Sequence, residues 1–151
     1  MKFQKDTLIR FLLAILAFMA VDAVLWTLGF LATRSLYVDA RYYTIWTRDV
    51  LTLIEGGHGS IQSLIGIEIL TGLVGALYVG GYQWLGRKLP GMALQRGLTY
   101  GTLMFVCGGL YQLLGVAMVI DLPAPIITSW IVLSGAVLVL QGVTTAYIVK
   151  K

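Results

Sequence analysis

Four predominantly apolar stretches, each about as long as a helix that crosses a bilayer, dominate the sequence. They lie at residues 8–33, 60–85, 98–122 and 125–149. A hydrocarbon core of about 30 Å is crossed by about 20 helical residues. We therefore predict an all-α, antiparallel four-helix transmembrane bundle, in which residues 1–151 form a single domain with an outer loop at 34–59.

The composition excludes the other common classes of protein. The chain of 151 residues is 58% hydrophobic and 12% charged, whereas a soluble domain is about 25% charged. An ordinary soluble enzyme and an intrinsically disordered chain are therefore excluded. The single cysteine, Cys107, rules out a disulfide framework and argues against a cysteine metal cluster. We expect neither a metal nor a cofactor.

The basic residues predict how the chain is oriented in the cell membrane. Eight of the eleven Lys and Arg residues flank one side of the predicted bundle: Lys2, Lys5, Arg10, Arg87, Lys88, Arg96, Lys150 and Lys151. By the positive-inside rule, both termini and the loop between the second and third stretches are cytoplasmic in an inner-membrane, multi-pass protein. Because these bases flank apolar stretches, they indicate contact with the lipid bilayer and no nucleic-acid partner. The first stretch is too long for a signal peptide and is interpreted as an uncleaved span.

Small residues repeat at helical spacing in three of the four stretches. The predicted contact positions are Gly72, Ala76 and Gly80 in the second stretch and Gly101, Gly108 and Gly115 in the third. Small residues let helices approach closely where the hydrophobic effect does not drive association. Packing within one bundle is one interpretation, and contact with a second protomer is the other. We also expect the face of the three third-stretch glycines to point inward.

The outer loop carries an amphipathic pattern. Its apolar positions recur at helical spacing: Tyr42, Ile45, Trp46, Val50 and Leu53. This predicts a short helix lying on the outer membrane interface, and a cap folded over the mouth of the bundle is the alternative. His58 follows in a glycine-rich turn. A lone histidine does not make a haem or metal site, so we interpret it as a residue presented to water.

Asp22 and Glu68 are the acids inside the predicted spans. An ionisable residue at membrane depth is costly, so it usually faces the bundle interior and has a partner or a function. At 1.5 Å per residue, both acids lie roughly 12–17 Å below the outer surface. We therefore predict that they face each other across the first two helices and that at least one is protonated at neutral pH, because desolvation disfavours the charged form.

Polar side chains from the other helices fall at a similar level. The predicted binding pocket is formed by Asp22, Glu68, Gln112, Tyr111, Ser134 and Trp26. Its acids can bind a cation or relay a proton. In the alternative interpretation, each acid is a neutral hydrogen-bonding group that only holds the helices together. A third interpretation is a metal site.

Short motifs are distributed over most of the chain. They are Val21-Asp22 with Trp26 and Gly29, Tyr37 and Trp46-Thr-Arg48, Arg96-Gly97 with Tyr100-Gly101, and Pro125 with Trp130 and Gly135. Together they resemble a broad group of small, uncharacterised bacterial four-helix integral membrane proteins. The resemblance implies the fold and no function.

The sequence favours a small integral membrane protein with an outward-facing polar pocket that binds or passes a small cation, a proton or a small solute. The alternative is a non-catalytic accessory or assembly subunit that packs against a larger membrane complex or against itself. The sequence contains no nucleotide-phosphate motif, no His-Glu-x-x-His and no Gly-x-Ser-x-Gly. An enzyme is therefore the least favoured class.

Overall fold

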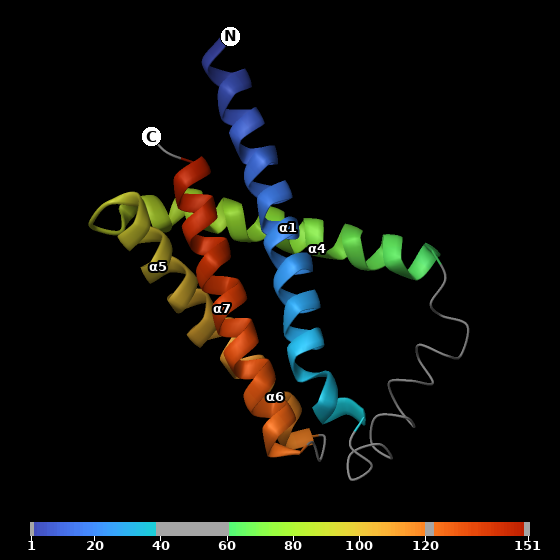
Figure 1. Ribbon diagram of the computed structural model, residues 1–151. Coiled ribbons are helices and arrows are strands. Elements are labelled where there is room, and N and C mark those ends of the chain that lie inside the picture. The colour runs from blue at the N-terminus through green and yellow to red at the C-terminus, as the bar shows by residue number, and fades with distance from the viewer. Residues whose placement is uncertain (1, 39–60, 120–122, 150–151) are drawn as a thin grey trace.

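The computed structural model describes residues 2–38, 61–119 and 123–149, and every regular element in these ranges is a helix (Figure 1). The elements are α1 (Lys2–Val38), α4 (Ile61–Trp84), the short 3₁₀ turn η2 (Gly86–Lys88), α5 (Ala93–Met104), the π-helical segment η3 (Phe105–Leu110), α6 (Tyr111–Val119) and α7 (Ala124–Ile148). Because α5, η3 and α6 follow one another without a break, the described chain forms four long helices. The predicted all-α class is confirmed for these residues.

Helix α1 extends beyond the apolar stretch at both ends. It runs from Lys2 to Val38, whereas the outer loop was predicted to begin at 34. Residues 34–38 contain neither glycine nor proline, so nothing in the sequence stops the helix there. The rest of the predicted loop, with its amphipathic segment and His58, lies outside the described residues.

Two of the described helices are long and apolar enough to cross a membrane. They are Asp6–Leu36 within α1 and Ala124–Ile148, with mean hydropathies of 2.4 and 2.0. Only 11% of the residues in the first window and 22% in the second are buried. A core helix of a soluble protein of this length would bury most of its apolar residues.

The four helices are not arranged as a simple up-and-down bundle. Figure 1 shows α1, α7 and the continuous helix from α5 to α6 running roughly along one direction, while α4 crosses them obliquely. Helices α1 and α7 are antiparallel, since Phe18 of α1 contacts Gln141 of α7 and Gly29 lies against Leu133. The N-terminus and the C-terminus lie at the same end of the molecule, which we call the termini end.

Glycines bring α5 and α7 into backbone contact. A Cβ atom at Gly97 would lie 2.6 Å from the Cα atom of Val143, and one at Gly101 would lie 2.6 Å from the Cα atom of Val139. A Cβ atom at Gly142 would lie 2.9 Å from the Cα atom of Gly101. The three glycines therefore form a contact into which no side chain fits, as is typical of small residues between membrane helices.

The predicted seven-residue glycine face of the third helix is interrupted. Gly101 contacts α7, but a Cβ atom at Gly108 or Gly115 would meet nothing within 4 Å. At Gly109 it would lie 2.9 Å from the Leu138 side chain. The physical reason is the π-helix η3, whose wider turn adds a residue and moves the position facing α7 from 108 to 109. The expectation that Gly101, Gly108 and Gly115 share one inward face is therefore wrong.

The largest buried cluster lies at the termini end. It consists of Ala14, Phe18, Tyr78, Val79, Tyr82, Tyr100, Ala146 and Val149. The rings of Tyr78 and Tyr100 are 5.0 Å apart and nearly perpendicular, an arrangement that aromatic pairs favour. The Tyr100 hydroxyl donates to the Tyr78 carbonyl at 2.8 Å, and the Tyr78 hydroxyl donates to the Leu138 carbonyl at 2.8 Å. These bonds tie α5 to α4 and α4 to α7.

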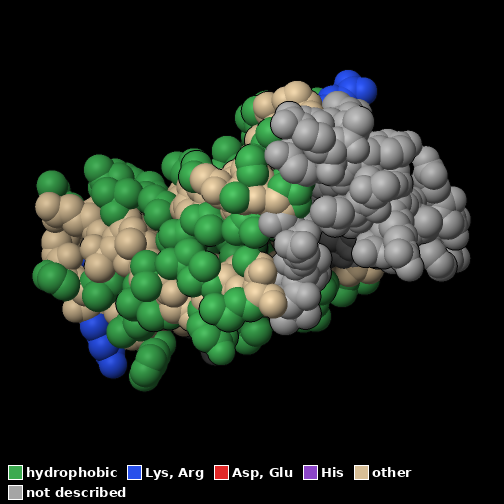
Figure 2. Space-filling view, turned by 90° about the horizontal axis from the view of Figure 1, so that it is seen from below, with side chains coloured by type: hydrophobic (Ala, Val, Ile, Leu, Met, Phe, Trp, Pro, Cys, Tyr) green, Lys and Arg blue, Asp and Glu red, His purple; other side chains and the backbone are tan. Residues whose placement is uncertain are grey.

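Away from this cluster, large apolar side chains remain exposed. The N-terminal half of α4 extends away from the other helices (Figure 1), and Ile65, Ile69, Leu70 and Leu73 are all exposed on it. Seen from the end opposite the termini, most of the described surface is hydrophobic (Figure 2). We call this the open end.

Candidate polar site between α1 and α7

Asp22 lies at the middle of the longest apolar helix. It is the one charged residue between Arg10 and Arg34, and it is twelve positions from each, which is about 18 Å along a helix. The Asp22 side chain is half-buried. This position places the carboxyl group as far as the sequence allows from the charged ends of α1.

Gln141 of α7 is the residue that contacts Asp22 from the opposite helix. The side chain is 1% exposed, and its Nε2 atom donates to the Phe18 carbonyl oxygen at 3.2 Å and to Oδ1 of Asp22 at 3.4 Å. Both partners are acceptors, so they hold the amide with its nitrogen toward α1. The amide oxygen must then point away from both acceptors.

Two buried polar atoms next to this contact have no hydrogen-bond partner among the described residues. They are Oε1 of Gln141 and Oγ1 of Thr145, and Thr145 is also 1% exposed. The two residues are four positions apart, so they lie on the same face of α7. Leaving such a group unsatisfied costs about 1–3 kcal/mol. A donor or a cation bound here would remove that cost.

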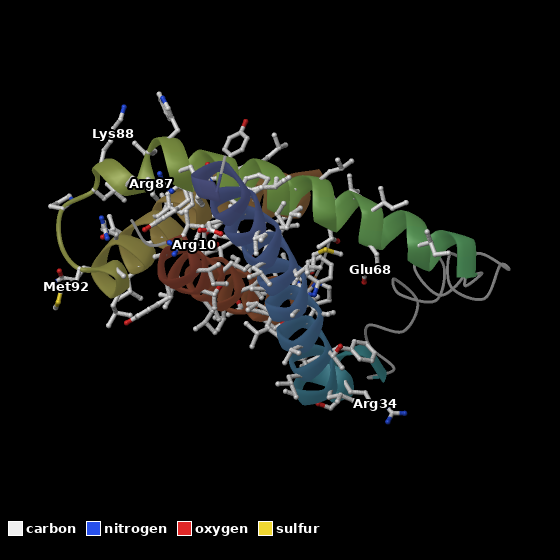
Figure 3. The ribbon with its side chains drawn as sticks, turned by 90° about the horizontal axis from the view of Figure 1, so that it is seen from above. Arg10, Arg34, Glu68, Arg87, Lys88 and Met92 are labelled. Atoms are coloured by element: carbon white, nitrogen blue, oxygen red, sulfur yellow. The ribbon has the colours of Figure 1, made fainter. Side chains whose placement is uncertain are left out.

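Trp26 and Glu68 lie around the same carboxyl group. Trp26, one turn along α1, and Glu68 of α4 both act on the Asp22 carboxyl group. Glu68 is exposed, on the half of α4 that extends away from α5 and α7 (Figure 3). That the two carboxyl groups form a closely facing pair stays a prediction.

The other predicted pocket residues are not gathered around Asp22. Tyr111 is 79% exposed and Gln112 is exposed, because both follow the π-helix and point away from the contact with α7. Ser134 is half-buried on α7, seven positions before Gln141. Of the predicted glycine positions, Gly72 lies against Met19 of α1, where a Cβ atom would be 3.5 Å from its sulfur. Ala76 is half-buried, and a Cβ atom at Gly80 would meet nothing within 4 Å.

Gln141 was not selected as a pocket residue from the sequence, although a signal for it exists. Gln141 and Thr145 are polar residues on one helical stripe of an otherwise apolar segment. The stripe indicates a polar face, but it does not say which acid the face meets. Only the antiparallel register of α1 and α7 places Gln141 opposite Asp22.

Among the residues that the structure describes, the arrangement offers oxygen atoms and no basic side chain. Asp22, Gln141 and Thr145 together present carboxylate, amide and hydroxyl oxygens, which suit a proton, a water molecule or a hard cation. Within the described ranges, no three His, Cys, Asp or Glu residues group closely enough to hold a metal ion. Comparison with other proteins adds no functional assignment, since no family model, curated protein or solved structure matches the chain.

Proposed function

We propose that this chain is a small integral membrane protein of the inner membrane whose Asp22–Gln141–Thr145 site binds or passes a small cation or a proton. In this proposal all four long helices lie in the membrane, and both termini are cytoplasmic. The observation that carries it is the buried Gln141 amide, which contacts the Asp22 carboxylate and leaves its own oxygen unpaired beside the Thr145 hydroxyl.

The exposed apolar surface supports the membrane placement. Side chains such as Leu16, Leu77 and Met118 are between 62% and 87% exposed, and a soluble protein rarely shows contiguous apolar patches of the size seen in Figure 2. In lipid the same side chains are in contact with acyl chains and carry no penalty.

The shape of the molecule supports access to the Asp22 side of the site from the open end. Phe18, one helical turn before Asp22, belongs to the buried cluster, so tight packing closes the site toward the termini end. On the other side, Glu68 and Trp26 are exposed. With the termini cytoplasmic, the open side faces outward.

The site is tested by flux of H⁺ or Na⁺ into proteoliposomes, with Thr145→Val as the first variant. Val keeps the shape and removes the unpaired hydroxyl, so we expect an unchanged fold and a loss of flux. The neighbouring Thr144→Val is the matched control, because the Thr144 hydroxyl is already paired with the carbonyl oxygens of Leu140 and Gln141 at 3.0 Å. Equal flux in both variants would refute a role for the Thr145 hydroxyl.

Asp22→Asn separates binding from structure. An amide still hydrogen-bonds but carries no charge, so the variant keeps the fold and loses flux if the site binds a cation or a proton. Glu68→Gln is the comparison: loss of flux in both variants supports the paired-acid hypothesis, and loss in Asp22→Asn alone assigns the chemistry to the α1–α7 site. Normal flux in both would refute the proposal.

The orientation is tested by cysteine labelling of intact cells in a Cys107→Ala background. Gly91 has a positive φ of 98° and tolerates a side chain poorly, so we choose the neighbouring Met92, which is 74% exposed. An impermeant maleimide should not label Met92→Cys from outside, and it should label His58→Cys. The opposite result would reverse the topology.

A non-catalytic accessory subunit is the second candidate, and the third helix favours it. Gly108 and Gly115 have free space around them, and Tyr111 and Met118 beside them are highly exposed. Small residues beside large exposed ones are typical of a face that receives another helix. Native mass spectrometry in detergent tests this: an assembly that Gly115→Leu dissociates, with flux absent throughout, would favour the accessory subunit.

A further inference from the structure

A second group of polar side chains lies at the termini end, between α4 and α5. Arg87 and Lys88 lie in the turn η2, and Arg96 lies in the first turn of α5. Figure 3 shows Arg87 and Lys88 at the opposite side of the molecule from Arg34. A turn and a helix that follow each other closely thus place three basic residues in one region.

Two of these arginines act electrostatically on the same tyrosine. The positive charges of Arg87 and Arg96 both interact with the Tyr82 hydroxyl. The Tyr82 ring itself is buried and stacks edge-on with Tyr100 at 5.2 Å. The Tyr82 hydroxyl is therefore within electrostatic range of both guanidinium groups, and all three groups carry hydrogen-bond donors.

Both arginines have a buried donor without a partner. The Nε atoms of Arg87 and Arg96 are shielded from solvent, and neither has an acceptor among the described residues. An arginine that served only as a topology signal would keep its guanidinium hydrated at the membrane surface. Two unpaired Nε–H donors in adjoining elements suit a ligand with several acceptor oxygens.

Packing fixes the position of the turn that carries Arg87 and Lys88. Gly86 lies so close to the Tyr82 ring that a Cβ atom there would overlap it. The Lys88 ammonium lies 5.0 Å from the centre of the Trp84 ring, within the range of a cation–π contact. Trp84 is exposed, as tryptophans at the headgroup level of a membrane are.

We infer that Arg87, Arg96 and Tyr82, with Lys88 at the rim, form a binding site for a phosphate group, and that the ligand is the headgroup of an anionic phospholipid. Arginine pairs recognise phosphate oxygens through their paired N–H groups, and basic pockets on the cytoplasmic side of membrane proteins bind anionic headgroups. This inference rests on the membrane placement proposed above, but it does not depend on the Asp22 site.

The test measures binding of phosphatidylglycerol and phosphatidylcholine to the detergent-solubilised chain by native mass spectrometry. We expect retention of phosphatidylglycerol and not of phosphatidylcholine. The double variant Arg87→Gln/Arg96→Gln should bind phosphatidylglycerol about tenfold more weakly, since each basic residue near a membrane surface contributes measurably to anionic-lipid binding. Arg34→Gln is the matched control, because Arg34 is exposed at the other end of α1, and it should bind as the unmodified chain does.

Inorganic phosphate as a competitor distinguishes the source of the ligand. If phosphatidylglycerol is displaced only at a high phosphate concentration, the ligand is the lipid headgroup. If inorganic phosphate alone binds tightly, the site binds phosphate but its ligand is not the lipid. Equal binding of both lipids, or equal loss in Arg34→Gln, overturns the site altogether. Tyr82→Phe is a second variant that keeps the test valid if the double variant misfolds. It removes one hydroxyl, and it should weaken lipid binding while the circular dichroism spectrum stays unchanged. A chain that fails to enter membranes at all would contradict the proposed function instead.

Discussion

The two ends of the molecule are held together differently. At the termini end, tyrosine rings and backbone-to-backbone glycine contacts join α1, α4, α5 and α7 into a closed cluster. At the open end, the π-helix turns the small residues of the third helix outward, and the N-terminal half of α4 extends to one side of the molecule. The Asp22–Gln141 contact lies at the boundary between the two.

In the proposed membrane placement, this difference shows which contacts hold helices together in apolar surroundings. Lipid offers no hydrophobic drive for helix association, so close backbone approach and hydrogen bonds must supply it. The termini end has both kinds of contact. The open end has exposed apolar side chains that contribute nothing to association in lipid. Its glycines Gly108 and Gly115 have free space around them.

The largest loss of stability should come from Gly142→Ala, at the closely packed termini end. The added methyl group would overlap backbone atoms of Gly97 and Gly101, which cannot move aside as a side chain can. We expect a loss of about 2–3 kcal/mol or more, the usual cost of overpacking, measured as a lower unfolding temperature in detergent.

Gly115→Ala is its control, because the same methyl group meets nothing within 4 Å at that position. It should leave the unfolding temperature unchanged or raise it slightly, since alanine favours helix more than glycine does. Equal destabilisation by the two variants would mean that the open end is as tightly packed as the termini end.

A smaller effect is expected from Gln141→Leu, at the boundary between the two ends. Leucine has a similar volume but leaves the Phe18 carbonyl and the Asp22 carboxylate without the Gln141 donor. We expect a loss of about 1–3 kcal/mol, which is the cost of unsatisfied buried polar groups. The double variant Gln141→Leu/Asp22→Leu should recover part of it, and a thermal-denaturation cycle over the four proteins measures the coupling.

Tyr100→Phe tests the hydrogen bond inside the closed cluster. The ring keeps its edge-on contacts with Tyr78 and Tyr82, and only the bond to the Tyr78 carbonyl is lost. A loss of about 1 kcal/mol is expected. A change below the detection limit of thermal unfolding would show that aromatic packing alone holds α4 on α5.

The smallest difference in stability is expected between the alanine variants at Gly109 and Gly108. A methyl group at position 109 would press on the flexible end of the Leu138 side chain, whereas at position 108 it meets free space. We expect Gly109→Ala to lower stability by less than about 1 kcal/mol and Gly108→Ala to lower it not at all. The reverse order in thermal unfolding would show that the third helix continues as a regular α-helix through residues 105–110.

The sequence alone determined what depends on local pattern and composition. Long apolar stretches predict helices, because a helix satisfies its own backbone hydrogen bonds whatever surrounds it. The predicted stretch at 125–149 and the observed α7 therefore differ by one residue at each end. Asp22 was also recognisable as a candidate site residue, because a charge in the middle of an apolar helix is visible without any partner.

The tertiary structure decided everything that depends on rotation and register. A single extra residue in η3 changes which glycine faces α7, and the seven-residue repeat in the sequence gives no sign of it. The oblique crossing of α4 places Glu68 on an exposed arm. The register of α1 on α7 selects Gln141, and not Gln112, as the partner of Asp22. Helix formation is local. Which side of one helix contacts another depends on the fit of side chains that are more than a hundred residues apart in the sequence.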